Sequence, residues 1–479
     1  MLHARAQLAL FLLTCLALPL ACGAGNSKKD QPVVIVLLCD TLRRDALSCY
    51  GNERIATPGL DGIAAEGTRF DQAISTSGWT LPSVASMLTG TWPSVHKAGG
   101  RSARFSAITP DLPLGQEVLK RAGFRTLAFV NAAFLDGRLG LARGFDLFDH
   151  EDVYVANIRR ADVTLDKALL EIERANVDAP VFALVHLFDP HLNYDPPRGW
   201  DEGFTQNGLP ALPISHEKVQ RLWPRERGAA PDKAVIEHVR RAYEAEVRFV
   251  DAQVARFVSE LRAREIWDRA LVVVVADHGE EFWEHGTFEH GHTLYDELIR
   301  VPLIVKLPKA LGPVVPESEA QIRTLDLFPT IFDALQIKPP PSFIGESLLP
   351  LMHGAELPPR IAFSERNLYG DERIAWRTDP YKYVISRSPN GSTREELFDW
   401  RADPAELHDL SAEPARLELL ERLRHEAAAF RYSQTEKGAM LGDGPTLDLS
   451  PSANANYLEW IEKERKRLRE LGYVGRDGE

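Results

Sequence analysis

The sequence predicts an α/β fold in which helices cover both faces of a mostly parallel sheet, followed by a smaller α+β domain. Apolar runs of strand length alternate with helical patterns up to about residue 305, which is typical of a parallel sheet between two layers of helices. Nearer the C-terminus, short strand-like runs follow one another directly, which indicates antiparallel pairing. The strand-length runs of the first part lie at 32–38, 126–130, 181–186, 271–276 and 301–305.

The clearest predicted helix covers residues 235–261, where apolar residues recur every three or four positions between charged ones. Residues 197–231 combine Gly, Pro and mixed charge without a period, so we expect a surface excursion that forms part of a ligand rim. After the prolines at 339–341, we expect short strands at 361–364, 373–377 and 381–386, and a helix at 414–431. The predicted division is a larger domain at 32–345, an α+β subdomain at 346–432, and a loop with a terminal helix at 433–479.

The first 22 residues are expected to be an export signal rather than part of the fold. A weakly basic start precedes an apolar run over residues 8–21, which is too short to cross a bilayer comfortably. Cys22, followed by a small and polar tether at 23–31, resembles a bacterial lipoprotein cleavage site. We therefore expect the mature chain in the periplasm, on the cell envelope as a lipoprotein, or secreted. Lipid anchoring at Cys22 and plain secretion both stay open.

The charge balance argues against one class of partner. Lys and Arg number 56 against 69 Asp and Glu, which gives a formal net charge of −13. A surface this acidic does not favour nucleic acid as the general partner, because a phosphate backbone needs a basic face. The balance leaves open a local site for an anionic ligand.

Acidic residues and a histidine follow two of the predicted strands at the point where each strand ends. Asp40 closes the first strand, and Asp277 and His278 follow the most apolar run of the chain. Open α/β sheets bind ligands at these strand ends. Gly279 would permit a tight turn that lets both neighbours reach one cation. A turn-capping Asp beside a solvated His is the alternative, and two strand-end acids in one chain favour the metal site.

A hydroxyl residue stands at the predicted start of another helix. Thr80 precedes Pro82, which suits the first turn of a helix with Thr80 as its N-cap. The simpler interpretation is that Thr80 only caps the helix, and periodicity alone favours it. The functional interpretation is that a hydroxyl at a helix N-terminus beside a cation acts as a nucleophile, while free N–H groups hold an anion.

Several segments together resemble a known family. In chain order they read VVIVLLCDTLRRDALSCYGN, WTLPSVASMLTGTWPSVH, HLFDPHLNYDPP, VVVVADHGEEFWEHGTFEHGHTLYDELIRVPLIV and ELFDWRADPAELHDL. This set is similar to the sulfatase branch of the alkaline phosphatase superfamily. The resemblance implies an alkaline-phosphatase/sulfatase-like sandwich around a mostly parallel sheet, with a smaller C-terminal α+β domain. It implies metal binding by Asp40, Thr80, Asp277 and His278, a nucleophile at Thr80, catalytic contacts of His191 and His290 with the ester anion, and Asp189 beside them in substrate binding.

The departures from the family pattern shape the expected chemistry. Sulfatases have a Cys or Ser that is oxidised to formylglycine, followed by Pro, Ser and Arg; this chain has Thr80 and, in place of the Arg, Val84. Oxidation of a threonine would give only a ketone, so we do not expect formylglycine. Thr41 replaces the second acid of the expected pair after the first strand, and the sulfate-binding Lys is missing. With a His ligand and fewer carboxylates, the resemblance implies one divalent metal, with Zn²⁺ or Mn²⁺ favoured over Ca²⁺ and a second metal open.

The sequence therefore predicts an exported hydrolase of phosphate-type esters with a Thr80 nucleophile, as in phosphodiesterases and phosphoethanolamine transferases of the superfamily. Two alternatives stay open. One is a sulfuric ester hydrolase that uses Thr80 without formylglycine, and the other is a non-catalytic metal-binding member. The expected substrate is a small-molecule, glycan or lipid ester, and the sequence does not give the oligomeric state.

Overall fold

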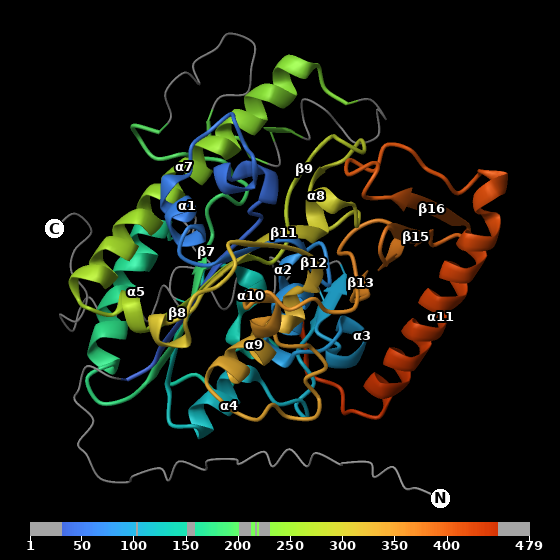
Figure 1. The fold of residues 1–479 in the computed structure, drawn as a ribbon. Coiled ribbons are helices and arrows are strands. Elements are labelled where there is room, and N and C mark those ends of the chain that lie inside the picture. The colour runs from blue at the N-terminus through green and yellow to red at the C-terminus, as the bar shows by residue number, and fades with distance from the viewer. Residues whose placement is uncertain are drawn as a thin grey trace, which may run out of the picture.

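The structure, a computed structural model, describes residues 31–101, 104–150, 159–200, 212–215, 218–219 and 230–448. An eight-stranded sheet forms the centre of the described part (Figure 1). From one edge to the other its strands are β12 (Glu317–Arg323), β2 (Thr68–Ile74), β11 (Arg300–Lys306), β8 (Ala270–Ala276), β1 (Val33–Cys39), β7 (Val181–Leu187), β5 (Arg125–Phe129) and β6 (Leu147–Asp149).

The sheet is mostly parallel, as predicted. β1 pairs in parallel with β7 and β8, and β5 with β7 and β6. β11 runs antiparallel to both of its neighbours, β2 and β8. Every residue of β1, β7 and β8 is buried, because helices cover both faces, and this explains their unbroken apolar sequences. The predicted strands are all present, whereas β2, β6 and β12 were not predicted because polar residues interrupt them.

Two groups of helices cover the sheet (Figure 1). On one face lie α1 (Pro58–Ala64), α5 (Ala161–Ala175) and α7 (Lys233–Ala263), and α7 contacts both α1 and α5. On the other face lie α2 (Thr80–Thr89), α4 (Gly115–Arg121) and α9 (Leu327–Ala334), and α2 contacts both α4 and α9. The α7 helix contains the predicted helix at 235–261 and extends it at both ends.

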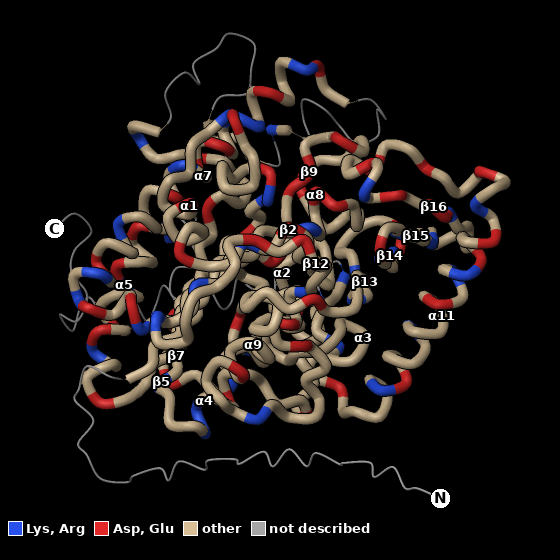
Figure 2. The backbone as a smooth tube through the Cα atoms, viewed as in Figure 1, with Lys and Arg blue, Asp and Glu red and all other residues tan. Residues whose placement is uncertain are grey.

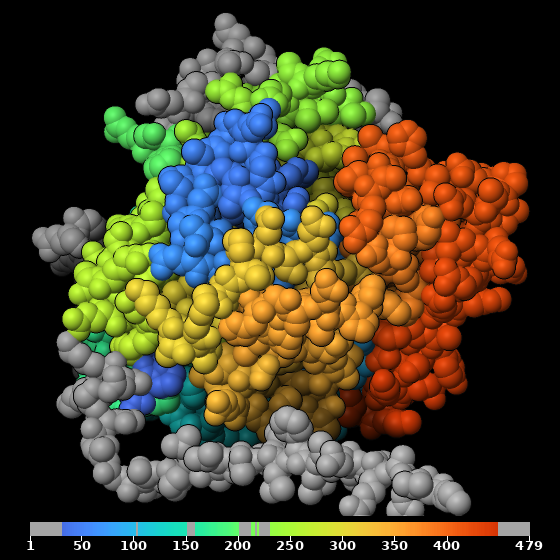
Figure 3. Space-filling view, in the orientation of Figure 1, coloured from blue at the N-terminus to red at the C-terminus, as the bar shows by residue number. Residues whose placement is uncertain are grey.

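The C-terminal domain forms a lobe on the body of the molecule (Figure 3). Its antiparallel sheet contains β13 (Ala362–Glu365), β14 (Glu372–Arg377), β15 (Tyr381–Arg387) and β16 (Thr393–Asp399). The long helix α11 (Leu417–Ala439) packs against α3 (Pro93–His96) and against β14 and β15. The predicted α+β character is confirmed, while the exact domain boundaries stay predictions.

Two predictions for the C-terminal segment were wrong. The helix continues to Ala439, so the loop predicted from residue 433 begins too early. Gly438, which lies within the predicted loop, instead permits close packing, because an added Cβ would lie 2.2 Å from the Ser94 carbonyl oxygen. Further along, β17 (Thr446–Asp448) pairs with β4 (Arg104–Ser106), which in turn pairs with β3 (Gly99–Arg101).

Buried polar contacts join the C-terminal domain to the segment between β8 and β11. Lys382 Nζ lies 2.9 Å from Asp296 Oδ1 and 2.7 Å from Glu406 Oε1, with all three side chains buried. The Tyr295 hydroxyl donates to Glu396 Oε1 at 2.7 Å. This segment is therefore fixed between the central sheet and the C-terminal domain.

Acidic and basic residues alternate along the exposed helices, as along α5 and α11 (Figure 2). Among the described residues, no helix has the length and apolar character needed to cross a membrane. The predicted export signal, most of the surface excursion at 197–231 and the predicted terminal helix lie outside the described residues.

Candidate active site

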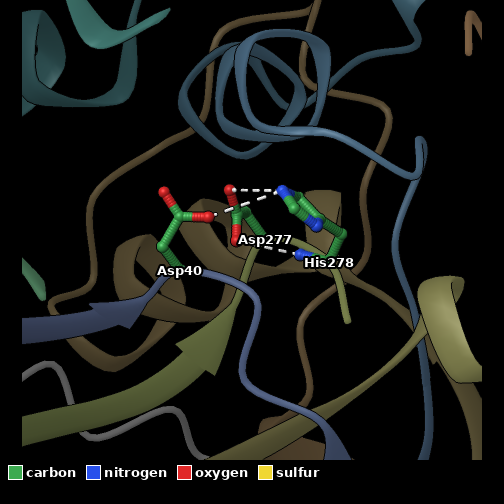
Figure 4. A group of neighbouring side chains, drawn as sticks. All are labelled: Asp40, Asp277 and His278. Carbon is green, nitrogen blue, oxygen red and sulfur yellow. Dashed lines mark hydrogen bonds and ion pairs between the residues drawn. The ribbon is translucent and has the colours of Figure 1, made fainter. Parts of the chain in front are cut away.

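Two adjacent parallel strands bring Asp40 and Asp277 side by side. Cys39, the last residue of β1, pairs with Ala276, the last residue of β8, so the residue after each strand lies at the same edge. His278 follows directly, and one ligand atom from each of these three buried residues lies within 4.8 Å of the others (Figure 4). The sequence prediction that these side chains meet is thus supported by the geometry.

The His278 ring presents a lone pair to the two carboxylates. Its Nδ1 lies 2.9 Å from the Gly279 carbonyl oxygen, which can only accept, so the proton sits on Nδ1 and Nε2 is free. Nε2 lies 3.5 Å from Asp40 Oδ1 and 3.4 Å from Asp277 Oδ2. Burial, followed by the charge of His290, lowers the pKa of His278 to about 3, so the ring is neutral and suited to bind a metal.

Some carboxylate oxygens of Asp40 and Asp277 lack hydrogen-bond partners in the described part of the chain, as expected of atoms that bind a cation. Oδ1 of Asp40 and Oδ2 of Asp277 are buried and have no hydrogen-bond partner among the described residues, while Asp40 Oδ2 faces His186 Nε2 at 3.2 Å. Burial and the neighbouring Asp40 charge raise the pKa of Asp277 well above its usual range. A divalent cation would satisfy these atoms and offset the repulsion, so the residues fit a mixed oxygen and nitrogen site.

Gly279 keeps the turn after His278 compact. A Cβ at this position would lie 2.0 Å from the Glu297 carbonyl oxygen, and the Gly279 amide donates to the Leu298 carbonyl at 2.8 Å. The glycine is needed for this close approach of two backbones, not for a left-handed backbone conformation.

Thr80 is the first residue of α2 and does not cap it. Trp79 occupies the N-cap position, and no side chain makes a capping hydrogen bond there. The interpretation that Thr80 serves only as a cap is therefore wrong. Thr80 Oγ1 instead lies 3.3 Å from His278 Nε2, the nitrogen that also faces the carboxylates of Asp40 and Asp277.

The two histidines expected to contact an ester anion lie beside His278. The ring centres of His278 and His290 are 4.5 Å apart, and those of His290 and His191 are 4.9 Å apart. His191 Nδ1 contacts the Leu192 carbonyl oxygen, and burial lowers the pKa of His191. His191 is thus neutral with a free Nε2 lone pair, whereas the burial of His290 is outweighed by the charge of Glu280, which raises the pKa of His290 to about 9, so that ring is protonated at neutral pH.

Asp189 has a different local role. Its Oδ2 accepts a hydrogen bond from the Ala161 amide at 2.8 Å, at the first residue of α5. Burial raises the pKa of Asp189 to about 6. This carboxylate stabilises the start of a helix, and substrate binding by Asp189 stays a prediction.

Sequence reasoning missed two residues of the site. His186, near the end of β7, places Nε2 3.2 Å from Asp40 Oδ2. Glu280 holds His290 through a contact of 2.9 Å between Oε1 and Nδ1. The available signal for His186 was a single histidine in an otherwise apolar strand, and the signal for Glu280 was its place two residues after His278.

The family comparison agrees with this geometry. The profile of the sulfatase family matches residues 32–337. The chain belongs to the sulfatase family. A second profile, that of the C-terminal part of N-sulphoglucosamine sulphohydrolase, matches residues 283–433. The family resemblance inferred from the motifs is confirmed, and the chain is a sulfatase-like hydrolase.

Individual relatives are distant but cover most of the chain. An N-acetylglucosamine-6-O-sulfatase of Bacteroides thetaiotaomicron is 25% identical and covers 83% of this chain and 86% of its own. An arylsulfatase of Clostridium perfringens is 23% identical, covering 82% of this chain and 93% of its own. The crystal structure of a phosphonate monoester hydrolase of Agrobacterium radiobacter matches with a TM-score of 0.68 and 20% identity over 84% of this chain and 96% of its own. This last likeness confirms the fold.

Proposed function

We propose that this sulfatase-family protein is a metal-dependent hydrolase of phosphate-type esters with Thr80 as its nucleophile. The observation that carries the proposal is the position of the Thr80 hydroxyl, 3.3 Å from His278 Nε2 and free of any capping role. Family membership supports an ester hydrolase. The residues Thr80 and Val84 argue against formylglycine, because threonine cannot be oxidised to an aldehyde.

In the proposed reaction, Thr80 Oγ1 attacks the phosphorus of the ester in line with the leaving alcohol. The bond from phosphorus to that alcohol breaks, and Thr80 carries the phosphoryl group. Water or an acceptor alcohol then attacks the phosphorus, which breaks its bond to Thr80 and restores the hydroxyl. His290 donates an N–H to a non-bridging oxygen, and the free lone pair of His191 accepts a proton.

Asp40, Asp277, His278 and Thr80 are the residues that would hold the divalent cation. When bound, such a cation supplies positive charge that favours loss of the hydroxyl proton and offsets the charge of the ester. We favour Zn²⁺ or Mn²⁺, because one ligand is a histidine nitrogen.

Sulfate ester hydrolysis without formylglycine is the second candidate. It is favoured by the match to the C-terminal profile of N-sulphoglucosamine sulphohydrolase and by the sulfatases among the relatives. Phosphonate monoester hydrolases among the structural neighbours favour the phosphorus substrates. A glycan or lipid ester is compatible with both candidates.

The test is turnover of matched aryl esters by the purified mature protein, after its metal content has been measured. We expect phosphate mono- or diesters or phosphonates to be hydrolysed faster than the sulfate with the same leaving group. A clear preference for the sulfate, or an aldehyde at position 80 in the intact mass, would establish the second candidate instead.

We further propose that the chain is exported and processed near Cys22, as the apolar run at 8–21 indicates. If Cys22 is acylated, Cys22→Ser moves the mature protein from the membrane fraction to the soluble fraction. A soluble mature chain that is unaffected by the substitution would exclude only the lipid anchor. Unprocessed protein in the cytoplasm would exclude export.

A further inference from the structure

A cavity of about 490 Å³ lies between the C-terminal part of α11, β14 and the β3 strand on one side and the loop after β13 on the other. We call it the arginine pocket. Among the described residues, those that line it and carry a charge are Arg101, Arg366, Arg373, Arg431, Glu365 and Glu372. Four arginines against two glutamates leave an excess of two positive charges in a protein whose net charge is negative.

One of the four arginines has a carboxylate partner within the described part of the chain, since Arg431 pairs with Glu372. Arg101 instead donates to the Gly370 carbonyl at 3.2 Å, and Arg366 to a backbone carbonyl at 3.2 Å. Nε of Arg373 is buried with no hydrogen-bond partner among the described residues. These three guanidinium groups thus have no ion-pair partner among the described residues of the cavity, while Arg373 interacts electrostatically with the buried Glu281 outside it.

The other acid of the pocket does not neutralise them directly. Glu365 is buried, and its Oε1 accepts a hydrogen bond from the Ser94 amide at 2.6 Å. A second cavity of the molecule provides an internal comparison. That cavity is lined by as many acids as arginines: Arg43, Arg44, Arg240 and Arg300 with Asp45, Glu284, Asp296 and Glu297. The arginine pocket therefore carries an excess of positive charge that this second cavity lacks.

Guanidinium groups gathered around a cavity repel one another and lose part of their hydration, and a bound anion relieves both costs. Carboxylate, sulfate and phosphate groups match the paired donors of arginine. Such a ligand would also give the orphaned Nε of Arg373 an acceptor.

The pocket is separate from the candidate active site but shares a wall with it. The carbonyl oxygen of Arg366 accepts hydrogen bonds from Trp79 Nε1 and from Ser77 Oγ, and Trp79 directly precedes Thr80. Three residues after Arg366, the Tyr369 amide donates to the Gly291 carbonyl at 2.8 Å, beside His290. The loop after β13 thus has the pocket on one side and the site on the other.

We propose that the arginine pocket is a second anion site, which binds a carboxylate, sulfate or phosphate group separately from the site at Thr80. The group belongs either to a free inorganic anion or to a second charged group of the substrate. This proposal goes beyond the proposed function, because anion binding at the pocket does not depend on turnover at Thr80.

The test is calorimetric titration of sodium sulfate into the purified full-length protein with its metal. We expect Arg101→Gln together with Arg373→Gln to weaken the pocket's sulfate affinity by about tenfold or more, since each removes a charged donor. Arg422→Gln is the matched control, because Arg422 lies on α11 outside the pocket with a side chain that is 63% exposed. Equal sulfate binding by wild type and the double variant would overturn the proposal.

Two further measurements complete the test. Anomalous diffraction from selenate-soaked crystals should place an anion in the pocket, and selenate found solely near Thr80 would also overturn the proposal. Arg101 is exposed, so Arg101→Gln alone tests the pocket if the variant of the partly buried Arg373, Arg373→Gln, fails to fold.

Kinetics separate the two sources of the anion. We compare two aryl esters that differ in a remote carboxylate. If the substrate supplies the second group, the double variant raises KM for the carboxylated ester and leaves the neutral one unchanged. If the ligand is a free anion, both KM values stay unchanged while sulfate binding weakens. Failure of the wild-type protein to hydrolyse any ester would contradict the proposed function, and the sulfate titration would still decide the pocket.

Discussion

His290 Nδ1 lies 2.9 Å from Oε1 of the buried Glu280, whose other oxygen accepts a hydrogen bond from the Tyr194 hydroxyl at 2.9 Å. Burial alone would lower the pKa of His290, but the Glu280 carboxylate outweighs it and raises this pKa to about 9. The imidazolium is therefore the form present at neutral pH, and its second N–H remains for an anionic ligand.

The Glu280–His290 pair predicts a pH dependence. In wild type, activity that needs protonated His290 falls as the pH rises through about 9. In Glu280→Gln the fall begins at lower pH, because only the smaller effects of the Asp40 and Glu289 charges then oppose burial, and kcat/KM at about pH 8 drops on the order of tenfold. Tyr194→Phe keeps the carboxylate and is the control with a smaller shift. An unchanged pH–rate profile in Glu280→Gln would contradict this role.

Asp277→Asn should sharply lower the metal content of the purified protein, because an amide replaces a charged ligand. Elemental analysis of the two purified proteins measures the change. Asp251→Asn is the matched control: Asp251 is also a buried carboxylate, but it accepts from the Gly59 and Leu60 amides. Equal metal content in wild type and Asp277→Asn would remove Asp277 from the site.

Thr80→Ala should lose nearly all turnover while keeping fold and metal, and Thr80→Ser should keep part of the rate because the hydroxyl survives. Loss of a covalent nucleophile costs several orders of magnitude, against roughly 10²–10³ for one anion-stabilising donor. Single-turnover kinetics measure the rate that each Thr80 variant keeps relative to wild type. Thr89→Ala, at the other end of α2, is the control. A near-normal rate in Thr80→Ala would end the nucleophile assignment.

His186 should act on the metal through Asp40. The backbone N–H of Asn131 donates to His186 Nδ1 at 3.3 Å, so the ring proton of His186 sits on Nε2. This Nε2 faces Asp40 Oδ2 at 3.2 Å. We expect His186→Phe to weaken metal affinity by about 10–100-fold and His186→Gln, which keeps a donor, by less. Titration against a chelator measures this affinity. The prediction fails if the Phe variant binds metal as tightly as wild type.

The parts of the site that follow strand ends were predictable from the sequence. Asp40, Asp277 and His278 come directly after apolar runs, and the parallel sheet brings such positions together. His186 was not predictable, because it meets Asp40 only through the pairing of β1 with β7, which sets Leu38 opposite His186. The pairing of strands is a tertiary property that local sequence does not encode.

Other differences between the prediction and the structure have separate causes. Asp189 is near His191 in sequence, yet its carboxylate faces a helix start, since sequence proximity does not fix side-chain direction. The edge strand β12 escaped prediction because its first half is largely exposed and polar. The role of Thr80 depended on the family resemblance, because periodicity favoured a simple cap.

The antiparallel course of β11 determines which part of the molecule can change in sequence. Because β11 returns beside β8 in the opposite direction, the segment between them begins and ends at the edge where Asp277 lies. One excursion of the chain thus carries both His290 and the Tyr295 and Asp296 contacts to the C-terminal domain. The outer lobe can therefore diversify in sequence to suit new ligands while both ends of this excursion stay anchored in an unchanged central sheet.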